Sequence, residues 1–160
     1  MRTAVDTNVL VCLLNGEPGA AQVAQALLTA QAQGRLIISG LVYAELLVRY
    51  SESDLKKFLN STGILLDVLS EAVWRRAAAA WAQYLKARRH REAGYVCPRC
   101  GHTNVFACQH CAEPLGGPRL ILPDFIVGAH AAVQADALVS RERFGGFFAQ
   151  YFPELKVVIV

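Results

Sequence analysis

The chain has 160 residues, of which 54% are hydrophobic and 18% are charged. This balance excludes an intrinsically disordered protein and suits a single domain over residues 1–160. The net charge of +3 permits a nucleic-acid partner without requiring one. The sequence has no apolar stretch of the ~20 residues that a membrane-spanning helix needs. Asp6 and Asn8 also interrupt the place where a signal peptide would be apolar. We therefore expect a cytoplasmic protein without a membrane partner.

Short apolar runs alternate along the chain with longer segments of helical periodicity. The apolar runs are too short for helices and predict strands at residues 2–5, 36–38, 64–68, 137–139 and 156–160. Helical spacing predicts helices at 18–34, 41–49, from Ser53 or Asp54 to 59, at 70–92 and at 123–134, with a short aromatic helix or loop at 144–151. Strands that alternate with helices form right-handed βαβ units. We therefore expect an α/β domain with a central, mostly parallel sheet of about five strands.

Residues 95–119 differ in composition from the rest and are expected to form an insert. They contain two Cys-x-x-Cys pairs, Cys97 with Cys100 and Cys108 with Cys111. Because cytoplasmic thiols stay reduced, two such pairs offer four thiolates, which is the ligand set of a closed structural Zn²⁺ site. A redox dithiol and a rubredoxin-like iron site are the alternatives. The zinc knuckle either folds an insert too small for its own core, or presents residues to RNA or a partner.

Four acidic residues are placed where the predicted fold could bring them together. Asp6 follows the first strand and Glu142 follows the fourth, and ligands bind at the carboxyl edge of a parallel sheet. Asp124 lies in a first helical turn, which favours negative charge, and Glu45 lies among apolar neighbours, where a carboxylate is costly unless solvated or bound. Convergent carboxylates suit Mg²⁺ or Mn²⁺, which activates water for phosphodiester hydrolysis. Each acid alone also has a structural interpretation, as a turn cap, a helix acid or a surface ion pair.

Four segments resemble, in order, the motifs of PIN-domain ribonucleases. They are Ala4-Val-Asp6-Thr-Asn8-Val-Leu10, Tyr43-Ala-Glu45-Leu46, Leu122-Pro-Asp124-Phe-Ile-Val-Gly-Ala129 and Asp136-Ala-Leu-Val-Ser140-Arg-Glu142. The resemblance covers nearly the whole chain outside the insert, and the subgroup it points to is the VapC-like toxins of toxin–antitoxin pairs. It implies a PIN-like fold with three layers, α/β/α. The cysteine insert departs from most small members of the family.

The resemblance also implies a metal site with carboxylate ligands and orienting polar side chains. The implied ligands of Mg²⁺ or Mn²⁺ are Asp6, Glu45 and Asp124, and the orienting residues are Asn8 and Ser140. Glu142 stands where the family usually has Asp, and we expect it to complete the acidic pocket, directly or through water. Asp136 is its competitor, but it precedes the strand and is expected at the opposite edge of the sheet.

The implied function is a metal-dependent endoribonuclease that cleaves single-stranded or loop RNA. As a toxin it would be silenced by a protein antitoxin and would form a homodimer. A basic run is either a solvated helix end or a track for RNA phosphates; it consists of Lys86, Arg88, Arg89, Arg91 and Arg99. Two alternatives remain: a housekeeping nuclease of ribosomal-RNA processing, and a non-catalytic module that binds RNA or protein through the zinc knuckle.

Overall fold

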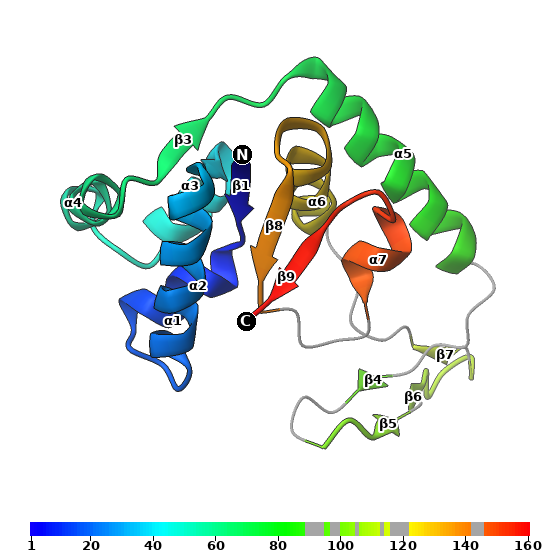
Figure 1. Ribbon diagram of the computed structural model, residues 1–160. Coiled ribbons are helices and arrows are strands. Elements are labelled where there is room, and N and C mark those ends of the chain that lie inside the picture. Colours follow the sequence, from blue (N-terminus) through cyan, green and yellow to red (C-terminus); the bar gives the residue numbers. More distant parts are fainter. Residues whose placement is uncertain (89–94, 97–99, 105, 113, 116–121, 142–145) are drawn as a thin grey trace.

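Five parallel strands form the central sheet of this protein, in the order β3-β2-β1-β8-β9 (Figure 1). The computed structural model describes residues 1–88, 95–96, 100–104, 106–112, 114–115, 122–141 and 146–160. The strands are β1 Arg2–Val5, β2 Arg35–Ser39, β3 Leu65–Asp67, β8 Ala137–Ser140 and β9 Val157–Ile159. All four pairings are parallel. The predicted α/β class and the parallel sheet are therefore confirmed.

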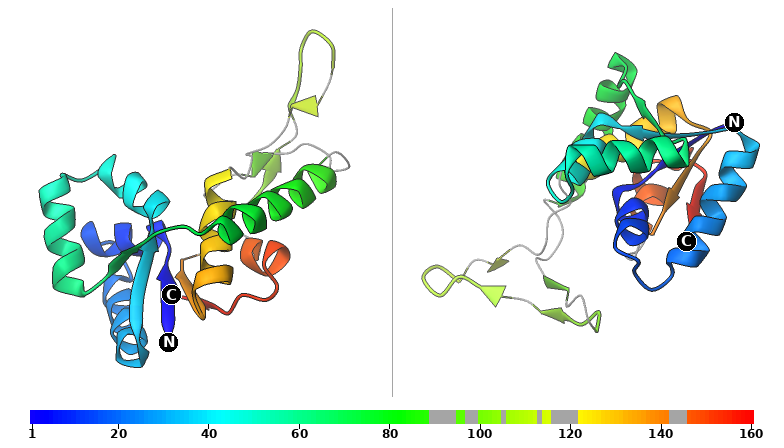
Figure 2. Two further views of the ribbon diagram at one scale, coloured as in Figure 1. Left: turned by 90° about the horizontal axis from the view of Figure 1, so that it is seen from above. Right: turned by 90° about the vertical axis from the view of Figure 1, so that its left-hand side faces the viewer.

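Helices cover both faces of this sheet. They are α1 Thr7–Leu14, α2 Ala20–Gln33, α3 Gly40–Leu47, α4 Glu52–Thr62, α5 Glu71–Arg88, α6 Leu122–Gln134 and α7 Phe147–Tyr151. Figure 2 shows α1 and α2 on one face and α5, α6 and α7 on the other. The arrangement has the three layers that the sequence predicts. No helix in the described part of the chain is both long and apolar enough to cross a lipid bilayer.

The core on the α5–α6–α7 side is aromatic. The ring of Phe125, which is fully buried, lies between 5.0 and 5.5 Å from the rings of four neighbours. These neighbours are Trp81, Tyr84, Phe147 and Tyr151. Phe152 is also fully buried, and its ring lies directly against the backbone of Gly128. This packing joins α6, which carries Asp124 in its first turn, to α5 and α7.

The sequence does not predict α1. Its residues, TNVLVCLL, are almost all apolar, so they lack the alternation of polar and apolar faces that reveals an amphipathic helix. Val9, Leu10 and Cys12 are each fully buried. Packing of this short helix against the body of the domain, and not its own periodicity, stabilises it.

Several helix boundaries differ slightly from prediction, and the starts of α4 and α2 have clear local causes. α4 begins earlier than expected, because Ser51 is its N-cap and its Oγ accepts from the Asp54 N–H at 3.2 Å. Serine is a favoured cap because its hydroxyl satisfies a free N–H of the first turn. α2 begins after Gly19, which adopts a left-handed φ of 94°. Such a conformation suits glycine, which has no Cβ to clash.

Two short antiparallel hairpins lie in the segment predicted as an insert. In one, β4 Tyr95–Val96 pairs with β5 Thr103–Asn104; in the other, β6 Phe106–Ala107 pairs with β7 Pro114–Leu115. Both stand apart from the central sheet, past the end of α5 (Figures 1 and 2). In the basic run, the side chain of Arg88 and all of Arg89, Arg91 and Arg99 lie outside the described residues.

Candidate functional site

The predicted site lies where the direction of the chain across the sheet reverses. β1 lies between β2 and β8. The chain passes from β1 to β2 and β3 in one direction across the sheet, and then returns to β8 and β9 on the other side of β1. Ligands of open α/β sheets bind at the carboxyl ends of strands at such a point. Asp6 follows β1 directly, and its N–H donates to the Val139 carbonyl of β8 at 3.0 Å. Asp6 and Ser140, the last residue of β8, are therefore neighbours at this edge.

Two side chains donate hydrogen bonds to one oxygen of Asp6. The Ser140 hydroxyl lies 2.7 Å from Oδ2 of Asp6, and Nδ2 of Asn8 lies 2.9 Å from the same atom. Ser140 is fully buried, whereas Asn8 lies in the first turn of α1. Oδ1 of Asn8 accepts from the Arg141 backbone N–H at 2.9 Å. The structure thus brings Asp6, Asn8 and Ser140 together in a connected hydrogen-bonded group.

Electrostatic interactions connect Asp6 with the other two predicted ligands. Burial raises the pKa of Asp6, and the negative charges of Asp124 and Glu45 raise that pKa further. Hydrogen bonds from Ser140 and from the Thr7 backbone lower the pKa but do not offset the rise. A raised pKa is the expected effect of gathering carboxylates at one site, because each negative charge disfavours the ionised form of its neighbours.

Glu45 is held by a residue that the sequence did not single out. The Thr7 hydroxyl donates to Oε2 of Glu45, and both side chains are half-buried. α3, which carries Glu45, begins at Ser39, whose Oγ accepts from the Val42 N–H at 3.3 Å. The one available signal for Thr7 was its position between Asp6 and Asn8 in the β1–α1 turn. The contact itself joins residues 38 positions apart, so no local pattern reveals it.

Two of the remaining acidic candidates, Asp124 and Asp136, lie at different places in the structure. Asp124 is half-buried in the first turn of α6, directly after Pro123, as predicted. Asp136 lies at the opposite edge of the sheet, where its Oδ2 accepts from the Arg2 N–H at 2.6 Å and its own N–H donates to the Arg2 carbonyl at 2.8 Å. The expectation that Asp136 stands away from the site is confirmed. Glu142 lies outside the described residues.

Within the described part of the chain, no three His, Cys, Asp or Glu side chains lie close enough to hold a metal ion together. The charges of Glu45 and Asp124 raise the pKa of Asp6, but the three carboxylates do not form a closed set of ligands. Cys97 lies outside the described residues, so the predicted set of four cysteines is not covered by this finding.

The second Cys-x-x-Cys pair forms a tight turn. The Ala112 N–H donates to the Cys108 carbonyl at 2.8 Å. Backbone N–H groups of Cys111 and His110, together with the Cys111 side chain, hydrogen-bond to the Cys108 sulfur and lower the pKa of its thiol. Ala112 has a φ of 60°, and Gly101, which follows the first pair, has a φ of 73°. A left-handed residue therefore follows the second cysteine of both pairs, which costs strain at Ala112 because it has a Cβ.

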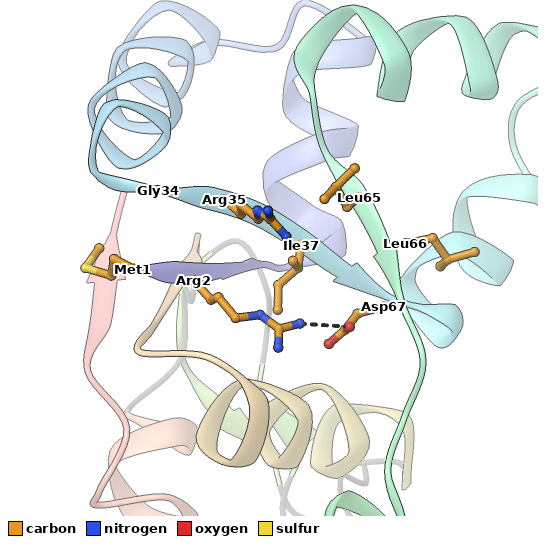
Figure 3. Close-up of a pocket in the computed structure, with 8 residues that line it drawn as sticks. All are labelled: Met1, Arg2, Gly34, Arg35, Ile37, Leu65, Leu66 and Asp67. Atoms are coloured by element: carbon orange, nitrogen blue, oxygen red, sulfur yellow. Dashed lines mark ion pairs between the residues drawn. The ribbon is translucent and has the colours of Figure 1, made fainter.

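A pocket of about 530 Å³ opens beside the amino-terminal ends of β1 and β2 and along β3 (Figure 3). It is lined by Met1, Arg2, Gly34, Arg35, Ile37, Leu65, Leu66 and Asp67. An ion pair of 2.8 Å joins Arg2 to Asp67 across it. None of the predicted site residues lines this pocket, so its hollow shape does not mark the acidic site.

Comparisons with known proteins agree with the fold. No curated protein matches the sequence. Three similar solved structures are VapBC2 from Rickettsia felis bound to a promoter DNA fragment (15% identity, TM-score 0.65, covering 99% of this chain and 98% of that one), a toxin–antitoxin complex from Klebsiella pneumoniae (21%, 0.57, 98% and 95%) and VapBC-1 from nontypeable Haemophilus influenzae (18%, 0.58, 99% and 98%). The PIN domain family matches residues 3–143. Because that match spans most of the chain, the protein belongs to the PIN domain family, whose members are nucleases.

Proposed function

We propose that this protein is a metal-dependent endoribonuclease that hydrolyses RNA phosphodiester bonds. The observation that carries the proposal is the position and environment of Asp6. It stands at the carboxyl edge of β1, where the chain direction reverses, and Ser140 and Asn8 both hold its Oδ2. The charges of Glu45 and Asp124 act on it. Two further negative charges disfavour the ionised form of an aspartate and would serve no purpose if Asp6 were purely structural.

The donor groups of this site fit a hard divalent cation. Mg²⁺ and Mn²⁺ prefer carboxylate oxygens, and Asp6, Glu45 and Asp124 supply them, with Glu142 proposed as a fourth. When bound, the ion would neutralise charge on the phosphate and make a water molecule more acidic. The chain's own polar groups orient the carboxylates: Ser140 and Asn8 hold Asp6, and Thr7 holds Glu45. These hydrogen bonds orient Asp6 and Glu45, the two carboxylates that would bind a cation together with Asp124.

We propose further that the nuclease is the toxin of a toxin–antitoxin pair. The similar structures are of VapBC and other toxin–antitoxin complexes, and the likeness extends over nearly the whole length of each chain. A protein antitoxin and a second copy of the chain are the partners that this assignment implies. Expression of the protein should arrest growth, and the purified chain should elute as a dimer in light-scattering chromatography.

Cleavage of a mixed pool of tRNA, rRNA and mRNA tests the proposal. The pool is incubated with Mn²⁺, Mg²⁺ or EDTA, and wild type is compared with Asp6→Asn and Asp136→Asn. Asp136→Asn is a matched control because it makes the same change at the opposite edge of the sheet. We expect wild type and Asp136→Asn to cut with metal alone, and Asp6→Asn to be slower by about 100-fold or more.

The outcomes separate the proposed nuclease from its rivals. Cleavage restricted to precursor rRNA without growth arrest would favour a housekeeping processing nuclease over a toxin. If no RNA is cut with either metal, the nuclease proposal fails, and a binding module that works through the zinc knuckle takes its place.

We propose that the insert binds one structural Zn²⁺ ion through Cys97, Cys100, Cys108 and Cys111. The spacing of the cysteines supports this, as does the left-handed residue that follows each pair. Elemental analysis of wild type, Cys108→Ser and Cys12→Ala tests it; Cys12 is a matched control because it is fully buried in the core. We expect wild type and Cys12→Ala to hold zinc and Cys108→Ser to lose it. Equal zinc content in all three proteins would refute the site.

A further inference from the structure

Arg141 is the residue directly after Ser140, and its side chain and its backbone engage two different parts of the domain. We infer that Arg141 is a positioning residue for the nuclease site: together with Glu17 it forms a latch that fixes Asn8, and through Asn8 the carboxylate of Asp6. The inference rests on the proposed nuclease function for its catalytic consequence. The latch itself, defined as the contacts of Arg141 with Glu17 and Pro18, rests on geometry alone.

The side chain of Arg141 is anchored on the turn between α1 and α2. Nη1 lies 2.7 Å from Oε2 of Glu17, and Nη2 donates to the Pro18 carbonyl at 3.1 Å. The exposed fractions of the two charged side chains are 16% for Arg141 and 33% for Glu17. A charge-assisted pair that is this sheltered is screened less by solvent than an exposed surface pair. The guanidinium therefore has a defined position.

The turn that receives Arg141 is itself ordered. The Glu17 N–H donates to the Cys12 carbonyl at 2.9 Å. Gly19 adopts its left-handed φ of 94° beside Nη2 of Arg141, which lies 3.8 Å from the place of a Cβ. On the other side of the turn, the Tyr50 hydroxyl donates to Oδ1 of Asn15 at 2.7 Å. Tyr50 follows α3, which carries Glu45, so the turn contacts both the segment after β8 and the segment after α3.

The backbone N–H of Arg141 connects the latch to the acidic site through Asn8. Its N–H donates to Oδ1 of Asn8 at 2.9 Å, and Nδ2 of Asn8 donates to Oδ2 of Asp6 at 2.9 Å. An amide side chain that accepts at one end and donates at the other cannot rotate without losing both bonds. Four residues thus form one continuous polar chain, in the order Glu17, Arg141, Asn8 and Asp6. Breaking the contact between Glu17 and Arg141 should therefore loosen the contact between Asn8 and Asp6.

The test compares Arg141 with an arginine that makes the same kind of contact elsewhere. Arg76 donates to Oε1 of Glu154 at 2.8 Å and to the Tyr151 carbonyl at 2.7 Å, so it too joins one carboxylate and one backbone carbonyl. The variants are Arg141→Ala, Arg141→Lys, Glu17→Gln and Arg76→Ala. The readouts are kcat and KM for RNA, Mn²⁺ affinity by calorimetry, and the melting temperature. A fourth readout is the exchange rate of the residue 141 amide in Glu17→Gln, measured by NMR.

We expect Arg141→Ala and Glu17→Gln each to lower kcat and Mn²⁺ affinity about tenfold with little change in KM. A protein that carries both Arg141→Ala and Glu17→Gln should be no worse than Arg141→Ala alone, because loss of the guanidinium already breaks the link to Glu17. Arg141→Lys should recover part of the loss, because lysine keeps the charge but not the two-pronged contact. Arg76→Ala should lower the melting temperature about as much as Arg141→Ala does, but it should leave kcat unchanged. The residue 141 amide should exchange about tenfold faster in Glu17→Gln.

Three results would overturn the inference. Equal kcat for Arg141→Ala and Arg76→Ala would make Arg141 merely structural. A rise in KM at constant kcat would mean that Arg141 binds the substrate and positions nothing. An unchanged amide exchange rate in Glu17→Gln would mean that there is no latch. That last readout needs no activity, so the latch is decided even if the wild type cuts no RNA and the proposed function fails.

Discussion

Nε2 of His130 lies 3.0 Å from Oδ2 of Asp67, so that the middle of α6 is joined to the end of the edge strand β3. His130 is only 1% exposed. Asp67 also accepts from Nε2 of Gln134 at 2.7 Å and pairs with Arg2 at 2.8 Å (Figure 3). Burial lowers the pKa of His130 by more than the Asp67 carboxylate raises it. Burial raises the pKa of Asp67, but His130 and Arg2 together hold it below its usual value.

Stability is therefore expected to fall as the pH is lowered from neutrality. The unfolded chain takes up a proton at His130 near its ordinary pKa of about 6.5, while the folded chain resists it, so stability declines below that pH by at most about 1.4 kcal/mol per unit. The stabilising contribution of the neutral His130 is complete above its pKa in the unfolded chain. It is lost as the pH falls towards the lower pKa of His130 in the folded chain. Asp67 acts in a lower window, because its contribution persists until the pH falls below its unfolded value of 3.8. Urea denaturation at several pH values between about 7.5 and 5 measures the effect.

His130→Gln removes the titration while keeping a donor for Asp67, and His102→Gln is the control because His102 is exposed. The pH dependence should flatten in the first variant and persist in the second. If His130→Gln loses stability with pH as steeply as wild type does, His130 is not its source.

A second prediction concerns Gly128 and the ring of Phe152. A Cβ at Gly128 would lie 2.3 Å from that ring, which is fully buried and cannot move aside. Alanine would gain about 1 kcal/mol from helix propensity, but overpacking a core costs about 1–3 kcal/mol and should win. Gly128→Ala should therefore lower the free energy of unfolding, as measured in urea.

Gly40 provides the matched control for this substitution. It is the first residue of α3, and a Cβ there would meet no atom within 4 Å. Gly40→Ala should be neutral or stabilising, because nothing opposes the propensity gain. A Gly128→Ala protein as stable as Gly40→Ala would show that the Phe152 ring yields.

Much of the fold follows from local patterns in the sequence. The short apolar runs around Ala4, Ile37 and Leu138 predict central strands correctly, because strands buried on both faces need apolar residues throughout. The placement of Asp6 and Ser140 at the same edge follows from the parallel direction of the strands, whereas their position side by side follows from the pairing of β1 with β8 in the structure. Likewise, Pro123 predicts a helix start one residue from the observed one at Leu122, and so places Asp124 in the first turn of α6.

The parts that the sequence did not predict depend on contacts between distant segments. The α1 helix at Thr7–Leu14 has no polar face, so only its buried position makes it helical. Thr7 and Glu45 meet across 38 positions, and Arg141 and Glu17 across 124. Neither pair leaves a periodic trace, because side-chain partners on different elements are chosen by the tertiary fold. The ligand arrangement of the cysteines stays a prediction.

Thr3, in the middle of β1, gives a third prediction. It is 1% exposed, and within the described part of the chain its Oγ1 is the buried side-chain atom that has no hydrogen-bond partner. Replacing it with the isosteric valine removes an unsatisfied hydroxyl and should stabilise the fold by about 1 kcal/mol. Thr3→Ser keeps the hydroxyl and deletes a buried methyl group, so it should destabilise by about 1 kcal/mol. Thr3→Val less stable than wild type would mean that the hydroxyl has a partner after all.

The contact between Thr7 and Glu45 gives the fourth prediction, which concerns activity and not stability. The Thr7 hydroxyl holds Oε2 of Glu45, so Thr7→Val should leave the carboxylate free to rotate and lower the cleavage rate about tenfold. Thr7→Ser retains the hydroxyl and should cleave at nearly the wild-type rate. The melting temperatures should differ little, since both side chains are only half-buried.

Rates of RNA cleavage under saturating Mn²⁺ and at low Mn²⁺ separate the two possible causes of a slower Thr7→Val. A defect that disappears at saturation reflects weakened metal binding, and one that persists reflects a misplaced carboxylate. Equal rates for Thr7→Val and Thr7→Ser under both conditions would show that Glu45 needs no such support.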